Sequence, residues 1–314
     1  MDTQRELFPF GNPDAVELPP KPDLESTSTV KEALPEFQEH MARKEFTTNT
    51  VKAFLHDMGL FAEFVGPEAT LKDCSTEKLR QFIHYLQHER GAPCSPKSLD
   101  RRITTLKVFF GWLADHGIVP NDPAAPLVHD RAQSPLPHIL TPEQAENILD
   151  IARSMRDADE APDARPYLLL SLLLATGIKK AECMRISLKH IDLTDVQRPA
   201  VYIHYDKPRQ RFKSRLLALP PDWPATLEIY LRRYQPKEML FECTPRNLEY
   251  VLHNISAVAG LRHPLTFEAL RWTSAVHSFR EGMDEERLRK RLGLSRISWR
   301  ETLPIIQTLA EGPL

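Results

Sequence analysis

Apolar residues recur at helical spacing over much of the chain, and two segments show this pattern most clearly. One begins after Ser75, whose hydroxyl can cap a helix by accepting a hydrogen bond from a free backbone N–H; its apolar positions are Leu79, Phe82, Ile83 and Leu86. The other begins at Ser95-Pro96, an N-cap followed by proline at the first helical position; its apolar positions are Leu99, Ile103, Leu106, Phe110 and Leu113. Each stripe gives a helix one face to bury, whereas Arg101 and Arg102 fall away from the second stripe. These patterns predict a small helical domain over residues 29–117.

Proline interrupts the helical pattern in two places. Residues 1–28 are acidic and contain prolines at positions 9, 13, 19, 20 and 22, a composition that predicts a disordered tail. Residues 118–140 contain prolines at positions 120, 123, 126, 135 and 137. Because each proline removes a backbone donor and disfavours helix before it, we expect an extended linker between two domains there.

A second domain is predicted over residues 141–314. Thr141 and Gln144 have the spacing of a capping box and restart the helical pattern. The longest apolar run, residues 167–175, predicts a buried helix. Residues 200–219 contain the short β-prone runs VYIHY and RLLAL, which indicate a small antiparallel sheet. The predicted fold class is therefore mainly α, with two helical domains of which the second carries this sheet.

The charge of the chain is unevenly distributed. A net charge of −2 at pH 7 argues by itself against a nucleic-acid partner. Residues 1–30 carry six acidic and two basic side chains, a net of −4, so the rest of the chain carries −2 − (−4) = +2. Within it, residues 201–240 and 261–300 are locally basic. This distribution fits a protein with one charged face, and it fits a solvated helix surface equally well.

Cysteine spacing and hydropathy exclude several classes of protein. The four cysteines lie far apart and form no CxxC pair, so neither a zinc site nor a disulfide framework is predicted. No apolar run approaches the roughly 20 residues that cross a bilayer. The first residues lack the basic start and apolar block of a secretory signal. We therefore expect a cytoplasmic protein with no membrane partner.

Three short motifs follow one another in the second domain. Residues 176–182 read TGIKKAE, residues 269–273 read ALRWT, and residues 292–295 read LGLS. In this order and spacing they resemble the TGxRxxE, HxLRHT and LGH boxes of the tyrosine recombinases, the phage integrase family with its Xer-like two-domain members. The resemblance implies an N-terminal SAM-like core-binding domain and a C-terminal domain of the recombinase catalytic fold. It also implies double-stranded DNA as the partner, and neither a metal nor another cofactor.

The resemblance implies a damaged catalytic site. In the family a tyrosine attacks the DNA phosphodiester, two arginines clamp the phosphate, histidines assist, and a lysine protonates the leaving oxygen. Of the two arginine positions, the first holds Lys179 and the second keeps Arg271. The two histidine positions hold Glu268 and Leu294, and the tyrosine position holds Leu303. Because no tyrosine follows Tyr250, a small shift of the alignment cannot restore the nucleophile.

The resemblance also implies which residues meet DNA. Arg101 and Arg102 are expected to do so in the first domain. In the second, the expected residues are Lys179, Lys207, Arg209, Arg211, Lys213 and Arg271. Either Lys207 or Lys213 matches the family's hairpin lysine. Glu182 is expected to pair with a nearby arginine or lysine, in a structural role.

The hypothesis that follows is a DNA-binding, catalytically inactive recombinase homologue in the nucleoid, accessory to recombination or integration of a mobile element. Its protein partner would be an active recombinase or a second copy, joined through the apolar C-terminal positions Ile305, Ile306 and Leu309. One alternative is an active enzyme in which Ser295, Ser298 or Thr302 replaces the tyrosine, although a hydroxyl needs an activating base. Another is a protein-binding scaffold that does not bind DNA, which the near-neutral charge and the acidic tail favour.

Overall fold

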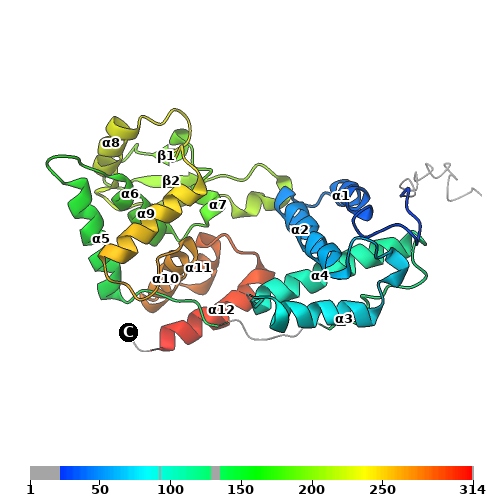
Figure 1. The fold of residues 1–314 in the computed structure, drawn as a ribbon. Coiled ribbons are helices and arrows are strands. Elements are labelled where there is room, and N and C mark those ends of the chain that lie inside the picture. Colours follow the sequence, from blue (N-terminus) through cyan, green and yellow to red (C-terminus); the bar gives the residue numbers. More distant parts are fainter. Residues whose placement is uncertain (1–21, 92, 129–134, 313–314) are drawn as a thin grey trace, which may run out of the picture. The chain divides into compact units, whose positions relative to one another are not determined.

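The computed structural model describes residues 22–91, 93–128 and 135–312. The chain divides into two compact units, Met1–Ser134 and Pro135–Leu314. Each unit has its own apolar core. The described residues are mainly helical, with one small antiparallel sheet, and this confirms the predicted fold class (Figure 1).

The first unit is entirely helical in its described part. Ser75 and Ser95 cap their helices through their hydroxyls, as predicted. All five apolar positions of the longer stripe are buried, and in the shorter stripe only Ile83 is not fully buried. The helical elements are α1 (Ala33–Arg43), α2 (Thr48–Val65), η1 (Leu71–Asp73), α3 (Thr76–His84), the π-helical turn η2 (Tyr85–Glu89) and α4 (Pro96–Asp115).

Two sequence expectations need correction in this unit. Residues 22–28, expected in a disordered tail, join the folded part, where the carbonyls of Ser26 and Ser28 accept hydrogen bonds from the backbone of η1. Residues 1–21 of that tail lie outside the described residues. Arg102, expected to point away from the core, is buried at 8% exposure because Asp57 on α2 supplies it with a counter-charge.

The segment that joins the two units takes part in both cores. Its first residues contribute to the core of the first unit through Ile118, Val119, Ala124 and Leu127. Leu140, near its end, belongs to the core of the second unit. Proline disfavours helix in this segment, yet its apolar residues still pack in the two cores.

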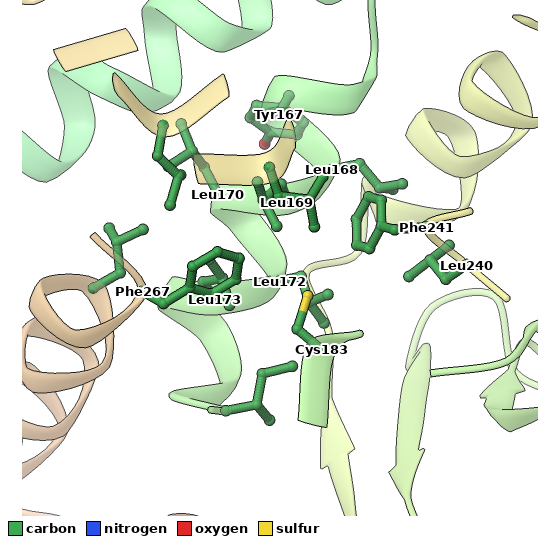
Figure 2. Close-up of a cluster of buried hydrophobic side chains, with 14 of the residues drawn as sticks. Tyr167, Leu168, Leu169, Leu170, Leu172, Leu173, Cys183, Leu240, Phe241 and Phe267 are labelled. Carbon is green, nitrogen blue, oxygen red and sulfur yellow. The ribbon is translucent and has the colours of Figure 1, made fainter. Parts of the chain in front are cut away.

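The second unit surrounds a helix that is buried on every side. That helix, α6, carries five leucines at no more than 1% exposure: Leu168, Leu169, Leu170, Leu172 and Leu173. Figure 2 shows them packed with Cys183, Leu240, Phe241 and Phe267, which come from other elements. A helix without a polar face must lie inside the fold, as predicted for residues 167–175. The helices here are α5 (Pro142–Arg156), α6 (Arg165–Thr176), α7 (Lys180–Cys183), α8 (Trp223–Tyr234), α9 (Pro245–Val258), α10 (Phe267–Arg280), α11 (Glu285–Arg291) and α12 (Arg296–Glu311), with the 3₁₀ turns η3 (Leu188–His190) and η4 (Pro208–Lys213).

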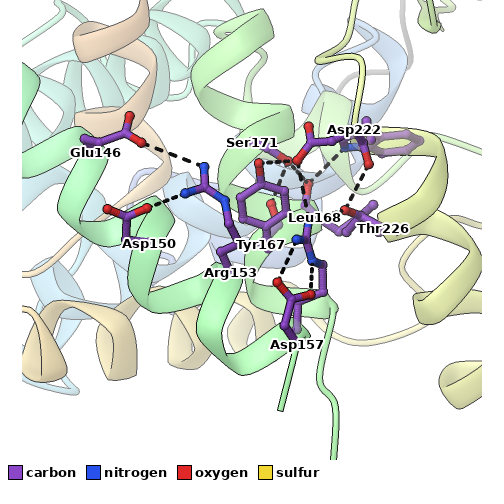
Figure 3. A network of polar contacts seen from close by, with 11 residues as sticks. Glu146, Asp150, Arg153, Asp157, Tyr167, Leu168, Ser171, Asp222 and Thr226 are labelled. Carbon is purple, nitrogen blue, oxygen red and sulfur yellow. Dashed lines mark hydrogen bonds and ion pairs between the residues drawn. The ribbon is translucent and has the colours of Figure 1, made fainter. Parts of the chain in front are cut away.

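A polar network joins α5, α6 and α8 at one end of this core (Figure 3). The ring of Tyr167 lies under the guanidinium groups of Arg153 and Arg156, at 5.4 and 4.7 Å from its centroid. Its hydroxyl donates to Asp222 at 2.6 Å. Arg156 also binds Asp157 and Thr226. Because every group has a partner, the network anchors the buried helix without an unsatisfied charge.

The sheet has the order β1-β2-β3 and is antiparallel throughout. Its strands are β1 (Ile191–Asp192), β2 (Ala200–Ile203) and β3 (Arg215–Ala218). The two predicted strands are β2 and β3, with Val201 opposite Leu217 and Tyr202 opposite Leu216. β1 is short and was not anticipated.

Helix α12 packs on its own unit. Ile306 is fully buried in a cluster with residues of α10 and α11, and Leu303 and Leu309 pack against it. Arg280 donates to the carbonyls of Leu309, Ala310 and Gly312 and so caps the end of α12. Of the three apolar positions expected to contact a partner, Ile306 and Leu309 pack within this chain, and the contact with a neighbouring molecule stays a prediction.

Candidate functional site

A cavity of about 730 Å³ in the second unit gathers four of the five substituted or retained family positions. Lys179, Glu268, Arg271 and Leu294 line it together with the aromatic side chains of Phe267 and Trp272. Lys179 lies about 90 to 115 residues before the other three in the sequence, so only the tertiary fold brings them together. The fifth position, Leu303, packs in the apolar cluster under α12, while its neighbour Thr302 lines the cavity.

A tight turn delivers Lys179 to this cavity. Helix α6 ends at Gly177, which has a positive φ of 62°. A Cβ at this position would lie 3.1 Å from both Leu292 and Ser274. Glycine is therefore favoured here for two reasons: it adopts the positive φ without strain, and it has no side chain to crowd these neighbours. Lys179 follows as the first residue before α7 and is exposed.

Arg271 lies at the base of the cavity and is largely buried. Its guanidinium donates to the carbonyl of Gly177 and, at 2.7 Å, to that of Leu292. Burial lowers the pKa of Arg271 to about 10. In the described part of the chain, no carboxylate lies within ion-pair distance of it. Two of its five N–H groups are thus used, and a buried cation is left without a counter-ion.

Lys179, although its side chain is exposed, also has no carboxylate within ion-pair distance among the described residues. Burial, and next the positive charge of Arg271, lower the pKa of its ammonium group. Lys213 and Arg215 act in the same direction, and only Glu182 opposes them. Two cations that repel one another across a cavity make a site that gains stability when an anion enters.

The carboxylate of Glu182 is already taken by Arg215. The two side chains form a double hydrogen bond of 2.9 and 3.1 Å, and Glu182 is only 3% exposed. Glu182 also accepts from the hydroxyl of Tyr205 and from the backbone N–H of Lys179, each at 2.8 Å. Burial raises the pKa of Glu182, but these bonds outweigh it and hold the pKa below its ordinary range. The predicted structural pairing of Glu182 is confirmed.

The partner of Glu182, Arg215, was not anticipated from the sequence. It also donates to the carbonyl of Arg291 at 2.6 Å. A Cβ at Gly293, in the third motif, would lie 2.7 Å from its Nη1 atom. Gly293 therefore leaves the space through which Arg215 reaches Glu182. Nothing in the local sequence distinguishes Arg215 from the other arginines of the hairpin.

Basic residues of the hairpin lie around η4. Of these, Lys207, Arg209 and Arg211 are exposed. Lys213 is half-buried, with its ammonium group 5.7 Å from the centre of the Tyr205 ring. The charge of Lys213 contributes to lowering the pKa of Lys179.

The candidate arginines of the first unit are held by one buried carboxylate. Asp57, at 2% exposure, binds Arg101 at 2.9 Å, Arg102 at 3.3 Å and the hydroxyl of Thr105 at 3.1 Å. Arg101 remains partly exposed, whereas the guanidinium of Arg102 is enclosed. Of this pair, only Arg101 offers a charged group to a ligand.

The described residues contain neither a metal-binding cluster nor a membrane-spanning helix. Within them, no group of three or more His, Cys, Asp or Glu side chains could hold a metal ion. Over the same residues, no helix has the length and apolar character needed to cross a membrane.

Family models match both units. Residues 138–301 match the phage integrase family, and residues 34–118 match the SAM-like N-terminal domain of phage integrases. Tyrosine recombinase XerC of Anoxybacillus flavithermus is 27% identical over 270 residues, covering 81% of this chain and 86% of that protein. Tyrosine recombinase XerD of Listeria innocua is 24% identical over 274 residues, covering 82% of this chain and 88% of that protein.

Solved structures show the same fold at lower identity. The XerH site-specific recombinase bound to palindromic difH has a TM-score of 0.68 at 15% identity, covering 92% of this chain and 88% of that one. The Tn1549 transposon integrase in complex with a circular intermediate DNA has a TM-score of 0.68 at 16% identity, covering 88% and 94%.

Proposed function

The chain belongs to the phage integrase family, the tyrosine recombinases, and from this premise we propose that it binds duplex DNA without cleaving it. One observation carries the proposal. Lys179 and Arg271 line one cavity, neither has a carboxylate partner among the described residues, and each has a lowered pKa. A buried cation without a partner is costly unless an anion completes it. We propose that a DNA phosphate does so.

Duplex DNA is favoured over a free anion by the surroundings of the cavity. The cations of the hairpin, Arg209, Arg211 and Lys213, make no ion pair in the described part of the chain. Such a row of unpaired cations suits a polyanion, since each contact releases counter-ions. Several family members have been solved with DNA, among them XerH with difH and a lambda integrase dimer with a COC′ core site.

The absence of cleavage is proposed from the groups that replace the catalytic ones. Leu303, on α12, has an alkyl side chain with no nucleophilic group and packs against an apolar cluster. The hydroxyls named as alternatives to the tyrosine are engaged within α12, where Ser295 caps the N-terminus and Thr302 donates to the carbonyl of Ser298 at 2.8 Å. Glu268 at the cavity would oppose a phosphate, and Leu294 cannot transfer a proton.

Salt-dependent titration of duplex DNA tests the binding. Each neutralised phosphate contributes about −0.9 to the slope of log affinity against log salt. We expect Lys179→Gln to flatten the slope by about 0.9, and the double change with Arg271→Gln by about twice as much. The matched control is Arg232→Gln, since Arg232 lies on α8, is exposed and is paired to Glu228. Absence of duplex binding at low salt, or an unchanged slope, would favour the scaffold alternative. The titration should be repeated without residues 1–21, whose acidic groups compete for cations.

The biological role proposed is accessory, beside an active recombinase of a mobile element, on DNA in the nucleoid. The test mixes this chain with an active family member on a shared recombination site. A ternary complex in which only the active protein becomes covalently attached to DNA supports the role. A covalent adduct of this chain on a nicked suicide substrate would instead establish it as an enzyme with an unconventional site.

A further inference from the structure

The outer face of the sheet is aromatic and exposed, unlike its inner face. Along β2, Val201 and Ile203 are buried at 0% and 3% exposure, whereas Tyr202 between them is 39% exposed. Leu216, its cross-strand partner on β3, is 60% exposed. The period of two along a strand separates the faces, so Tyr202 and Leu216 stand side by side on the side away from the core.

Two histidine rings extend this surface. The ring centres of Tyr202 and His204 are 5.8 Å apart, and His190 of η3 lies 6.3 Å from Tyr202 and 6.0 Å from His204. We call His190, Tyr202, His204 and Leu216 the aromatic face. Its residues are not among those that line the cavity at Lys179 and Arg271.

Cations border the aromatic face along the chain. Lys189 directly precedes His190, and Lys207 and Arg209 follow His204 at the start of η4; all three are exposed. The ion pairs of the described residues include none of these three. The nearest carboxylate in sequence, Asp206, is bonded to His204 at 2.9 Å. The rings are thus accompanied by positive charges that have no partner.

Exposed rings next to unpaired cations favour one kind of ligand. An apolar protein surface would leave the bordering cations unpaired, and the stacked bases of an intact duplex present no free ring faces. An unpaired nucleotide offers both a base that stacks on an aromatic ring and a phosphate that binds a cation. We infer that the aromatic face binds unpaired bases of a DNA strand, as in a single-stranded segment or a bulge. The inference goes beyond the proposed duplex contact and rests on the rings of the aromatic face, which the duplex proposal does not use; Arg209 is common to both.

The charge state of His190 is compatible with base stacking at neutral pH. Burial, and next the charges of His204 and Lys189, lower the pKa of His190 below its ordinary value of 6.5. Its ring is therefore neutral at pH 7. In the proposed complex a base stacks on rings that include this neutral imidazole, while the bordering cations hold the backbone.

The test measures the affinity of the full chain for a fluorescent oligothymidylate and, separately, for a duplex. Removing one stacking ring costs about 5- to 100-fold in affinity. We expect that loss for Tyr202→Ala with oligothymidylate, a change of less than about twofold for Tyr202→Phe, and no change in duplex affinity for either. The matched control is Tyr250→Ala, since Tyr250 on α9 is also exposed and lies beside a cation, Arg246. Leu216→Glu, which places a negative charge on the face without removing a ring, should also weaken oligothymidylate binding.

Three outcomes overturn the inference. The first is duplex binding without oligothymidylate binding, which leaves the proposed function standing. The second is equal loss with Tyr202→Ala and Tyr250→Ala. The third is unchanged oligothymidylate affinity in both Tyr202→Ala and Leu216→Glu. Failure of the proposed function gives a different result: the unaltered protein does not bind duplex DNA, or its duplex binding does not depend on Lys179.

Discussion

Two groups of arginines, one in each unit, differ in whether each guanidinium has a carboxylate partner. In the first unit, Asp57 binds both Arg101 and Arg102. In the second, Glu182 binds Arg215, and Arg271 remains without an acidic partner among the described residues. A paired guanidinium stabilises the fold, whereas an unpaired one is available to an external anion. Whether an arginine has a carboxylate partner, more than how deeply it is buried, therefore distinguishes a structural role from a binding role.

The largest expected effect comes from removing the carboxylate of the paired group. Asp57→Ala leaves Arg102 buried without a counter-charge, which costs about 3–5 kcal/mol. Urea unfolding of the full chain measures this as an earlier transition of the first unit. Glu228→Ala, which removes the partner of the exposed Arg232, serves as control and should cost at most about 1 kcal/mol. Equal effects in the two variants would contradict the distinction between buried and exposed pairs.

A smaller loss of stability is expected from filling the space beside Arg215 that lets it reach Glu182. Gly293→Ala would place a Cβ 2.7 Å from Arg215 and in left-handed backbone, with φ at 62°. The backbone cost alone is about 1–3 kcal/mol, and displacement of Arg215 adds to it. Gly260→Ala is the matched control, because Gly260 has φ 63° and no neighbouring atom within 4 Å of the added Cβ. The difference between the two free energies of unfolding isolates the contact with Arg215, and no difference would mean that Arg215 adjusts freely.

An oxyanion should stabilise the site at Lys179 and Arg271, which lacks a carboxylate, and should not affect the site at Asp57. Sulfate is expected to raise the free energy of unfolding of the second unit by about 1.4 kcal/mol at ten times its dissociation constant. Thermal unfolding in sulfate and in chloride at equal ionic strength measures this. Lys179→Gln should reduce the gain, whereas Asp57→Asn should not. A gain that persists in Lys179→Gln would place the anion elsewhere.

The smallest effect is expected from restoring the nucleophile. Leu303→Tyr should give no adduct that survives denaturant on a suicide DNA substrate, because Lys179, Glu268 and Leu294 still replace the groups that clamp the phosphate and transfer the proton. Catalytic groups that act as a unit are strongly non-additive. Appearance of an adduct would mean that the cavity around Lys179 and Arg271 holds a phosphate in reactive geometry.

Local patterns in the sequence predicted the helices α3, α4, α5 and α6 and the strands β2 and β3. The stripe from Leu99 to Leu113 is buried on α4, and Thr141 and Gln144 form the capping box of α5. These features depend on residues three or four positions apart, so they can be recognised without the fold. Strand β1 was missed because it has only two residues, Ile191 and Asp192.

Sequence patterns were enough to predict two domains, each with a core of its own, and, through three motifs, the positions Lys179 and Arg271. Which cations have partners could be read only from the folded chain. Asp57 precedes Arg102 by 45 residues, and Glu182 precedes Arg215 by 33. Whether a charge is stabilised in the interior depends on a counter-charge within about 4 Å, and no local pattern contains that distance. Arg102 was therefore misplaced, Arg215 was missed, and the unpaired state of Arg271 could be seen only once the chain was folded.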